Sequence, residues 1–258
     1  MIRAKKSLGQ HFLKDKNTAA EIVESLSANA ERILEVGPGT GALTDFLLAR
    51  PNVAFKAIEV DKEFVRRILE KYPDFEPNLI RGDFLKSDLS DLFDGKNFAV
   101  IGNFPYNISS QIFFKVIENR NLIPEVVGMV QKEVAERMAA AHGNKTYGIL
   151  SVLLQRWYDV EYLFTVHENV FLPPPKVKSA VVRLVRNARN KSDCDEKLFV
   201  KTVKTTFNQR RKTIRNSLKP ILGDKRFEHE FLTLRPEQLS VDDFVKLVSA
   251  LEKISTVD

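Results

Sequence analysis

Residues 32–42 have the sequence RILEVGPGTGA, in which an apolar run is followed by three closely spaced glycines. The apolar run, residues 32–36, is typical of a buried strand, and residues 40–49 have the pattern of a helix. Glycine suits such a junction because the backbone must turn sharply there and let a ligand approach where no Cβ stands in the way. The stretch therefore predicts the first strand, ligand-binding turn and helix of an α/β fold.

The alternation of strand and helix continues through the first two-thirds of the chain. Further strands are expected at Val53–Glu59, Asn78–Arg81, Phe98–Ile101 and Val126–Val130. Helices are expected near Thr40–Ala49, Asp61–Tyr72, Ser110–Asn119 and Glu133–Ala141. This order predicts a doubly wound, mostly parallel sheet. After another helical pattern at Tyr147–Trp157, the strand-like runs Val160–Val166 and Ala180–Arg186 suit an antiparallel hairpin at one edge of the sheet.

A different pattern follows the last strand-like run. The stretch Asn187–Glu196 is polar and has no periodicity, as expected of a linker. Beyond it, apolar residues recur at helical spacing, at Phe199, Val203 and Phe207 and again at Ile214, Leu218 and Leu222. We therefore expect one large domain over residues 1–187 and a small helical domain over residues 188–258.

The composition is that of an ordinary globular protein, with 43% hydrophobic and 29% charged residues. No apolar run approaches the roughly 20 residues of a membrane-spanning helix, and the basic start lacks the apolar stretch of a secretory signal. A cytoplasmic protein without a membrane partner is expected. The single cysteine, Cys194, and four histidines without metal-ligand spacing indicate chemistry that needs no metal.

The net charge of +6 is concentrated in two segments. Between Lys197 and Lys219 lie eight basic side chains and no acidic one, and residues 1–16 contain five basic side chains and one acid, Asp15. Either segment alone is more often a solvated helix face. Two such segments on either side of a ligand-binding domain favour a polyanionic partner, and nucleic acid is the class that fits.

Polar residues end or follow the next three strands at nearly regular spacing. Glu59 lies 22 positions after Gly37, Asp83 lies 24 positions after Glu59, and Asn103 follows after another 20. The carboxyl ends of parallel strands share one edge of a sheet, so these residues are expected to meet at a ligand site. Glu59 suits ribose hydroxyls, and Asp83 suits the exocyclic amine of an adenine, with Phe84 covering a ring face. Each acid alone is more often a helix cap or a solvated turn.

The tetrapeptide Asn103-Phe104-Pro105-Tyr106 suggests the reaction. The amino nitrogen of adenine is a poor nucleophile because its lone pair is delocalised into the ring. The Asn103 side-chain oxygen and the Pro105 carbonyl are acceptors that can hold its two hydrogens and aim the lone pair at the methyl carbon of a sulfonium. No strong base is needed, so catalysis is mainly positioning. Tyr106 suits stacking on the target base. The alternative is an ordinary Asn-x-Pro turn.

Together these motifs resemble the ribosomal RNA adenine N6,N6-dimethyltransferase family. Besides residues 103–106 and 35–41, the resemblance includes GQHFL at 9–13, FLPPPKV at 171–177 and FNQRRK at 207–212. It implies a Rossmann-like class I methyltransferase domain, a small helical RNA-binding domain, and S-adenosylmethionine as methyl donor. It also implies a substrate, two adjacent adenosines in the 3′-terminal hairpin loop of small-subunit (16S) rRNA, within the assembling small ribosomal subunit.

The resemblance assigns several residues by position. It implies cofactor contacts from His11, Leu13, Gly37, Gly39, Glu59, Asp83 and Asn103. At the target base it implies Asn103, Pro105, Tyr106 and Phe171, the last as a second stacking aromatic; without the resemblance, Phe171 would be interpreted as core. From the basic segment we expect phosphate contacts by Lys204, Arg210, Arg211, Lys212 and Arg215. The family more often has Leu or Ile where Phe104 stands, a departure that leaves both acceptors in place but can alter the pocket volume.

Three other functions stay open at this point. A large-subunit rRNA dimethyltransferase conferring macrolide resistance shares the catalytic motif, although residues 9–13 and the triple proline favour the small-subunit branch. A nicotinamide-dependent oxidoreductase fits Gly37, Gly39 and Ala42 as a dinucleotide fingerprint but leaves Asn103–Tyr106 unexplained. A ribosome-assembly or transcription factor that keeps the fold and has lost catalysis is the third, and the filled catalytic positions argue against it. Nothing in the sequence indicates an obligate dimer, so a monomer is expected.

Overall fold

The computed structural model describes residues 11–188 and 193–255. Most of the basic N-terminal segment and part of the predicted linker therefore lie outside the described residues. The chain divides into two compact units. The first runs to Ala135 and includes Asp159–Arg186, and the second consists of Glu136–Tyr158 and the chain from Asn187 onward. The second unit is thus built from two separate stretches of sequence.

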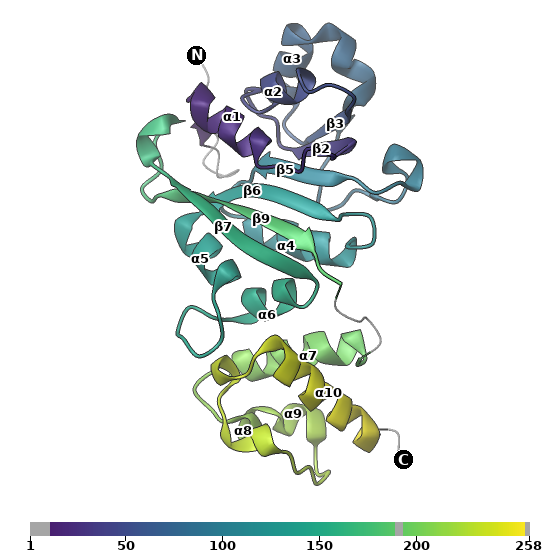
Figure 1. Ribbon diagram of the computed structural model, residues 1–258, viewed down its shortest axis with the longest axis vertical. Helices are drawn as coiled ribbons and strands as arrows, with labels where there is room; N and C mark the ends of the chain where they lie inside the picture. The colour runs from purple at the N-terminus through teal and green to yellow at the C-terminus, as the bar shows by residue number, and fades with distance from the viewer. Residues whose placement is uncertain (1–10, 189–192, 256–258) are drawn as a thin grey trace. The chain divides into compact units, whose positions relative to one another are not determined.

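A seven-stranded sheet forms the centre of the first unit (Figure 1). Its strands are β2 (Arg32–Val36), β3 (Ala54–Glu59), β4 (Leu79–Arg81), β5 (Ala99–Asn103), β6 (Glu125–Gln131), β7 (Tyr158–Val166) and β9 (Ser179–Arg186). They lie in the order β4-β3-β2-β5-β6-β9-β7. The strands from β4 to β6 are parallel, and β9 is antiparallel to β6. The predicted mostly parallel sheet with an antiparallel edge is confirmed.

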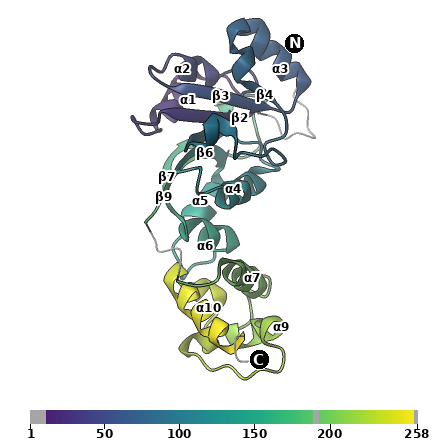
Figure 2. The same ribbon diagram turned by 90° about the vertical axis from the view of Figure 1, so that its right-hand side faces the viewer.

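Helices cover both faces of this sheet (Figures 1 and 2). The helices of this part of the chain are α1 (Lys16–Glu24), α2 (Thr44–Leu48), α3 (Lys62–Lys71), α4 (Ser109–Glu118) and α5 (Lys132–Ala139). Helices α1 to α3 pack on one face of the sheet, where their apolar side chains form a buried cluster with strand residues such as Ile33. Helix α4 packs on the opposite face. Because the strands are buried on both faces they are almost continuously apolar, which is why their sequence pattern identifies them.

A second sheet has only two short strands, which the sequence did not predict. It pairs β1 (Phe12–Leu13) with β8 (Phe171–Leu172) in antiparallel register, Phe12 opposite Leu172 and Leu13 opposite Phe171. The Lys14 N–H also donates to the Val170 carbonyl at 2.9 Å. Strands of two residues show no periodicity, so no sequence pattern could indicate them.

The second unit is helical. Its helices are α6 (Ile149–Gln155), α7 (Glu196–Phe207), α8 (Ile214–Ser217), α9 (Lys219–Leu222) and α10 (Val241–Ser255), together with the second half of α5. Short 3-10 helices in the described residues include Pro73–Asn78, Leu92–Gly95, Glu168–Val170, Glu230–Thr233 and Pro236–Gln238. The Phe207 ring of α7 lies against Phe244 of α10, with centroids 5.9 Å apart. None of the helices in the described residues is long and apolar enough to cross a membrane.

The unit boundary differs from the predicted one in one place. The sequence assigns everything up to residue 187 to the first domain, whereas the packing puts residues 136–158 with the second unit. The physical reason is aromatic contact: Trp157 meets Phe199 with ring centroids 6.1 Å apart, and Tyr147 meets Phe207 at 6.1 Å. These partners lie far downstream of Tyr147 and Trp157 in sequence, so chain order alone does not indicate them.

Candidate active site

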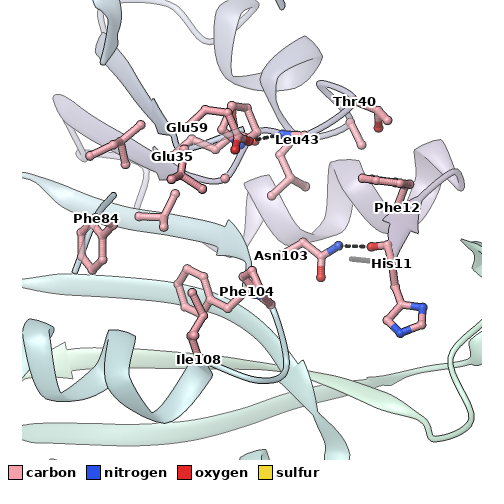
Figure 3. A pocket seen from close by; sticks show the side chains of 18 of the residues that line it. His11, Phe12, Glu35, Thr40, Leu43, Glu59, Phe84, Asn103, Phe104 and Ile108 are labelled. Atoms are coloured by element: carbon pink, nitrogen blue, oxygen red, sulfur yellow. Dashed lines mark hydrogen bonds between the residues drawn. The ribbon is translucent and has the colours of Figure 1, made fainter. Parts of the chain in front are cut away.

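The strand order reverses between β2 and β5, where a doubly wound sheet binds its ligand. Strands β3 and β4 continue to one side of β2, and β6 lies on the other side of β5. One cavity opens at the carboxyl ends of these strands (Figure 3). Among its lining residues are the following predicted ones: His11, Leu13, Gly37, Gly39, Glu59, Asp83, Phe84, Asn103, Pro105 and Tyr106. The convergence expected from parallel strands brings these residues together.

The glycine loop forms one wall of the cavity. Gly37 has a φ of +71° and Gly39 a φ of +54°, conformations that other residues adopt at a cost. A Cβ built on Gly37 would meet no atom within 4 Å, so the backbone borders open space there. The Gly39 N–H donates to the Glu59 carboxylate at 3.2 Å, which ties the loop to the end of β3.

Glu59 is buried and held by backbone donors. One carboxylate oxygen accepts from Gly39, and the other accepts from the Asp61 N–H at 2.8 Å. Burial raises the pKa of Glu59, while the backbone donors of Asp61 and Gly39 lower it. The carboxylate is therefore fixed at the cavity wall by the main chain rather than by a neutralising cation.

The cavity fits the S-adenosylmethionine that the family resemblance implies. Among the acidic side chains that line it, Glu59 and Asp83 can accept hydrogen bonds from a nucleoside. The Asp83 carboxylate accepts from the Leu85 N–H at 3.0 Å, which orients the acid. The ring of Phe84 is buried and lines the same cavity, where it offers an apolar face. Polar groups for the sugar and base lie beside an apolar surface.

Asn103 has a fixed orientation at the end of β5. Its side-chain N–H donates to the His11 carbonyl at 2.9 Å, which turns the amide oxygen away from His11 (Figure 3). The Pro105 carbonyl accepts from the Ile108 N–H at 3.2 Å and keeps a second lone pair. The two acceptors expected from the sequence both line the cavity.

Tyr106 is anchored from two sides. Its hydroxyl lies 2.6 Å from the Ser179 hydroxyl, at the start of β9. Its ring lies 5.3 Å from the His11 ring, whose Nδ1 is 2.9 Å from the Pro173 carbonyl. The segment that begins at His11 thus links Asn103, Tyr106 and the loop after β8.

Phe104 lines the cavity, but its ring packs against the sheet. Its ring is 1% exposed and lies against Gly102 of β5 and Gly128 of β6, which are opposite each other in register. A Cβ on Gly102 would stand 2.7 Å from the ring, and one on Gly128 would stand closer still. The ring edge also meets Phe113 of α4, with centroids 5.6 Å apart. We call Gly102 and Gly128 the glycine socket, since together they make room for the larger residue at this position.

Phe171 does not line the cavity. It is 1% exposed and belongs to the core beneath α1 to α3, as the sequence without the resemblance indicates. Leu13, its partner in the short sheet, does line the cavity. A stacking role for Phe171 would require its side chain to become accessible, and it stays a prediction.

Two of the five basic residues expected at the RNA form ion pairs within the second unit. The Arg215 guanidinium makes two hydrogen bonds to the Glu228 carboxylate, at 3.1 and 3.2 Å. Arg210 lies 3.7 Å from the Glu237 carboxylate. Arg215 is nevertheless exposed, as are Lys204, Arg211 and Lys212. Part of the positive charge in this segment is therefore balanced by acids from other segments, and the RNA contacts stay a prediction.

The sequence did not single out Glu35 by itself, although it lines the cavity and is 1% exposed. Its carboxyl accepts from the Thr44 hydroxyl at 2.7 Å. Burial raises its pKa to about 8, with a smaller upward contribution from the charge of Glu59. Among the described residues, no group of three His, Cys, Asp or Glu side chains could hold a metal ion.

Glu35 makes stability depend on pH in a defined window. Its folded pKa of about 8 lies above the ordinary 4.5, so the native state keeps a proton that the unfolded chain loses between these values. The free energy of unfolding is expected to fall as pH rises through this window, by at most about 1.4 kcal/mol per pH unit. Urea unfolding of Glu35→Gln at several pH values should show a flatter profile. A profile identical to the wild type would contradict the assignment.

Comparisons with known proteins agree with this geometry. The family model described as "Ribosomal RNA adenine dimethylase" matches residues 1–253. Bacteroides thetaiotaomicron has a "Ribosomal RNA small subunit methyltransferase A" that is 57% identical over 98% of this chain and 96% of that protein. The protein of the same name from Cytophaga hutchinsonii is 53% identical over 97% of this chain and 98% of that protein.

Two solved structures have the same fold. A dimethyladenosine transferase from Plasmodium falciparum aligns with a TM-score of 0.77 and 26% identity, over 95% of this chain and 98% of that chain. The 23S rRNA methyltransferase ErmE aligns with a TM-score of 0.65 and 25% identity, over 95% of this chain and 100% of that chain. The proteins named for the small subunit are thus much more similar in sequence to this chain than the one named for 23S rRNA.

Proposed function

The chain belongs to the ribosomal RNA adenine dimethylase family and is an rRNA adenine methyltransferase; from this premise we propose the substrate and the roles of its residues. The substrate is small-subunit (16S) rRNA within the assembling small ribosomal subunit. The reaction adds methyl groups to N6 of two adjacent adenosines in the 3′-terminal hairpin loop, giving N6,N6-dimethyladenosine. The protein acts as a monomer in the cytoplasm, where bacterial subunits assemble, and needs no metal.

The observation that carries this proposal is the fixed orientation of Asn103. Its N–H is committed to the His11 carbonyl at 2.9 Å, so its oxygen is the group left to accept a hydrogen bond from a base. The Pro105 carbonyl lines the same cavity and accepts a second one. Held by both acceptors, the target amine turns its lone pair out of conjugation and towards its reaction partner. The contribution is positioning and electrostatic preorganisation, and no general base is required.

S-adenosylmethionine supplies an electrophilic methyl group on a sulfonium when it is bound. Glu59 accepts hydrogen bonds from its ribose hydroxyls, and Asp83 from its adenine amine. The buried Phe84 ring contacts the adenine face, while Gly37 and Gly39 allow close approach of the main chain. His11 and Leu13, from the segment at the start of the described residues, line the same cavity and contact the cofactor.

Dimethylation places a specific demand on this site. After the first transfer the amine has one N–H, so only one of the two acceptors can still form a hydrogen bond with it. The pocket must also have room for the added methyl group. Because the Phe104 ring is seated in the glycine socket, it takes little of that volume. The Tyr106 ring, fixed through Ser179 and His11, stacks on the target base in both rounds.

The choice between the two ribosomal subunits is tested with both in parallel. Small and large subunits lacking adenine dimethylation are incubated with the protein and labelled S-adenosylmethionine. The 57% and 53% identical relatives are named for the small subunit, so we expect label in small-subunit RNA. Label confined to large-subunit RNA would indicate instead a large-subunit rRNA dimethyltransferase of the kind that confers macrolide resistance. Binding of NAD without S-adenosylmethionine would revive the oxidoreductase alternative.

The basic residues of the second unit are proposed to contact rRNA phosphates without reading sequence. Replacing Arg211 and Lys212 with Gln should then reduce the slope of log affinity against log salt by about 2. Binding to small subunits over a range of salt concentrations measures this slope. The matched control is Lys96→Gln, an exposed lysine before β5, at the sheet edge opposite the cavity. A slope unchanged by the double substitution would exclude these two contacts.

A further inference from the structure

Residues 172–178, which are the last residue of β8 and the loop that follows it, expose apolar side chains. Leu172 is 56% exposed and Val177 is 46% exposed. The other exposed large hydrophobic side chains among the described residues are single ones elsewhere, at Leu48, Val60 and Val185. Two such residues lie within one seven-residue segment, which makes this segment a candidate interaction surface.

Basic side chains alternate with the apolar ones on this loop. Lys176 and Lys178 are exposed and stand on either side of Val177. Lys14 is also exposed, and its N–H is bonded to the Val170 carbonyl just before β8. Residues 172–178 include no acid. The loop thus presents apolar contact and positive charge side by side.

The loop borders the cavity through residues that line it. Leu172 is opposite Phe12 in the short sheet, and the Pro173 carbonyl is 2.9 Å from Nδ1 of His11. Phe12, His11 and Tyr106 all line the cavity, and the His11 and Tyr106 rings are 5.3 Å apart. The loop is therefore connected through His11 to the ring of Tyr106.

We propose that residues 172–178 bind the RNA strand flanking the target adenosine. Leu172 and Val177 contact unstacked bases, and Lys176 and Lys178 contact phosphates. A single strand offers an apolar base face and an anionic phosphate at every nucleotide, which matches this alternation. A base that leaves its stack exposes its neighbours, and an apolar side chain there offsets the lost stacking. The inference rests on the proposed function, since it concerns the same RNA at the same site.

The test separates the apolar from the ionic contribution. In Leu172→Ser/Val177→Ser, the KM for small subunits should rise about tenfold, with the salt slope unchanged. In Lys176→Gln/Lys178→Gln, the salt slope should fall by about 2. The Kd for S-adenosylmethionine and the Tm should stay at wild-type values in both. The matched control is Leu48→Ser, which replaces a 42% exposed leucine of α2 that does not line the cavity.

Each outcome decides the inference. A KM within twofold of wild type, or a change no larger than that of Leu48→Ser, overturns it. Binding to protein-free small-subunit rRNA is measured in parallel. Equal weakening there supports RNA, whereas weakening confined to intact subunits would make a ribosomal protein the partner and overturn the proposal. If the wild-type protein methylates no small-subunit RNA, the proposed function is wrong. The effect of the loop substitutions on binding to small-subunit rRNA then still tests whether residues 172–178 contact RNA.

Discussion

Replacing Asn103 with Ala is expected to lower kcat for methyl transfer by about 10³-fold. The side-chain oxygen is the acceptor that holds one hydrogen of the target amine, and the Pro105 carbonyl, which also lines the cavity, holds the other, so it does not replace Asn103. The loss should appear mainly in kcat, because the interaction is strongest when the amine attacks. Transfer of labelled methyl groups to small subunits, measured at saturating concentrations of both substrates, gives this number.

Two controls isolate the role of the amide oxygen. Asn97→Ala removes an exposed asparagine just before β5, at the opposite end of the strand, and should leave kcat unchanged. Asn103→Asp keeps an acceptor but loses the N–H that donates to the His11 carbonyl at 2.9 Å, so the side chain is no longer held. We expect Asn103→Asp to be strongly impaired as well. A kcat of Asn103→Ala close to that of the wild type would show that the Asn103 side chain is not needed for methyl transfer.

Gly128→Ala is expected to have the second largest effect, on both stability and activity. The added Cβ would overlap the Phe104 ring, which is 1% exposed, so the ring would have to shift. Overpacking of this kind costs about 1–3 kcal/mol. Displacement of Phe104 also moves Asn103 and Pro105, and a shift of about 1 Å can cost on the order of 10² in kcat. Urea unfolding and kcat measure the two effects.

A second substitution distinguishes the glycine socket from a general defect. Phe104→Leu alone should cost stability, because it leaves part of the socket empty. Combined with Gly128→Ala, it should restore much of both stability and kcat, since the smaller side chain no longer meets the new Cβ. A coupling free energy of about 1 kcal/mol or more between the two sites is expected. Strictly additive effects would show that the ring and Gly128 act independently.

Much of the site was predictable because it is built from the ends of parallel strands. Gly37, Glu59, Asp83 and Asn103 each end or follow a strand with a clear apolar pattern, and a parallel sheet gathers such ends at one edge. The strand boundaries agree to within two residues, because strands buried on both faces are mostly apolar. Local pattern and topology were sufficient for these features.

Features that depend on distant partners were not predictable. The glycine socket requires Gly128 of β6 to stand opposite Gly102 of β5, and neither glycine shows a local pattern. The pairing of β1 with β8 joins His11 to Pro173 across 162 positions through strands of two residues. Arg215 counts as free positive charge in the sequence but is paired with Glu228 in the structure. In each case the partner is set by tertiary packing.

The identity of the methylated atom tests the central claim most directly. Small subunits lacking the modification are incubated with S-adenosylmethionine and either wild-type protein or Asn103→Ala, and the 3′-terminal hairpin is digested to nucleosides. The wild type should produce N6,N6-dimethyladenosine at both adjacent adenosines, and Asn103→Ala should produce almost none. Methylation at a ring nitrogen or a ribose hydroxyl, or dimethyladenosine formed equally by Asn103→Ala, would contradict a site built to hold the adenine amine.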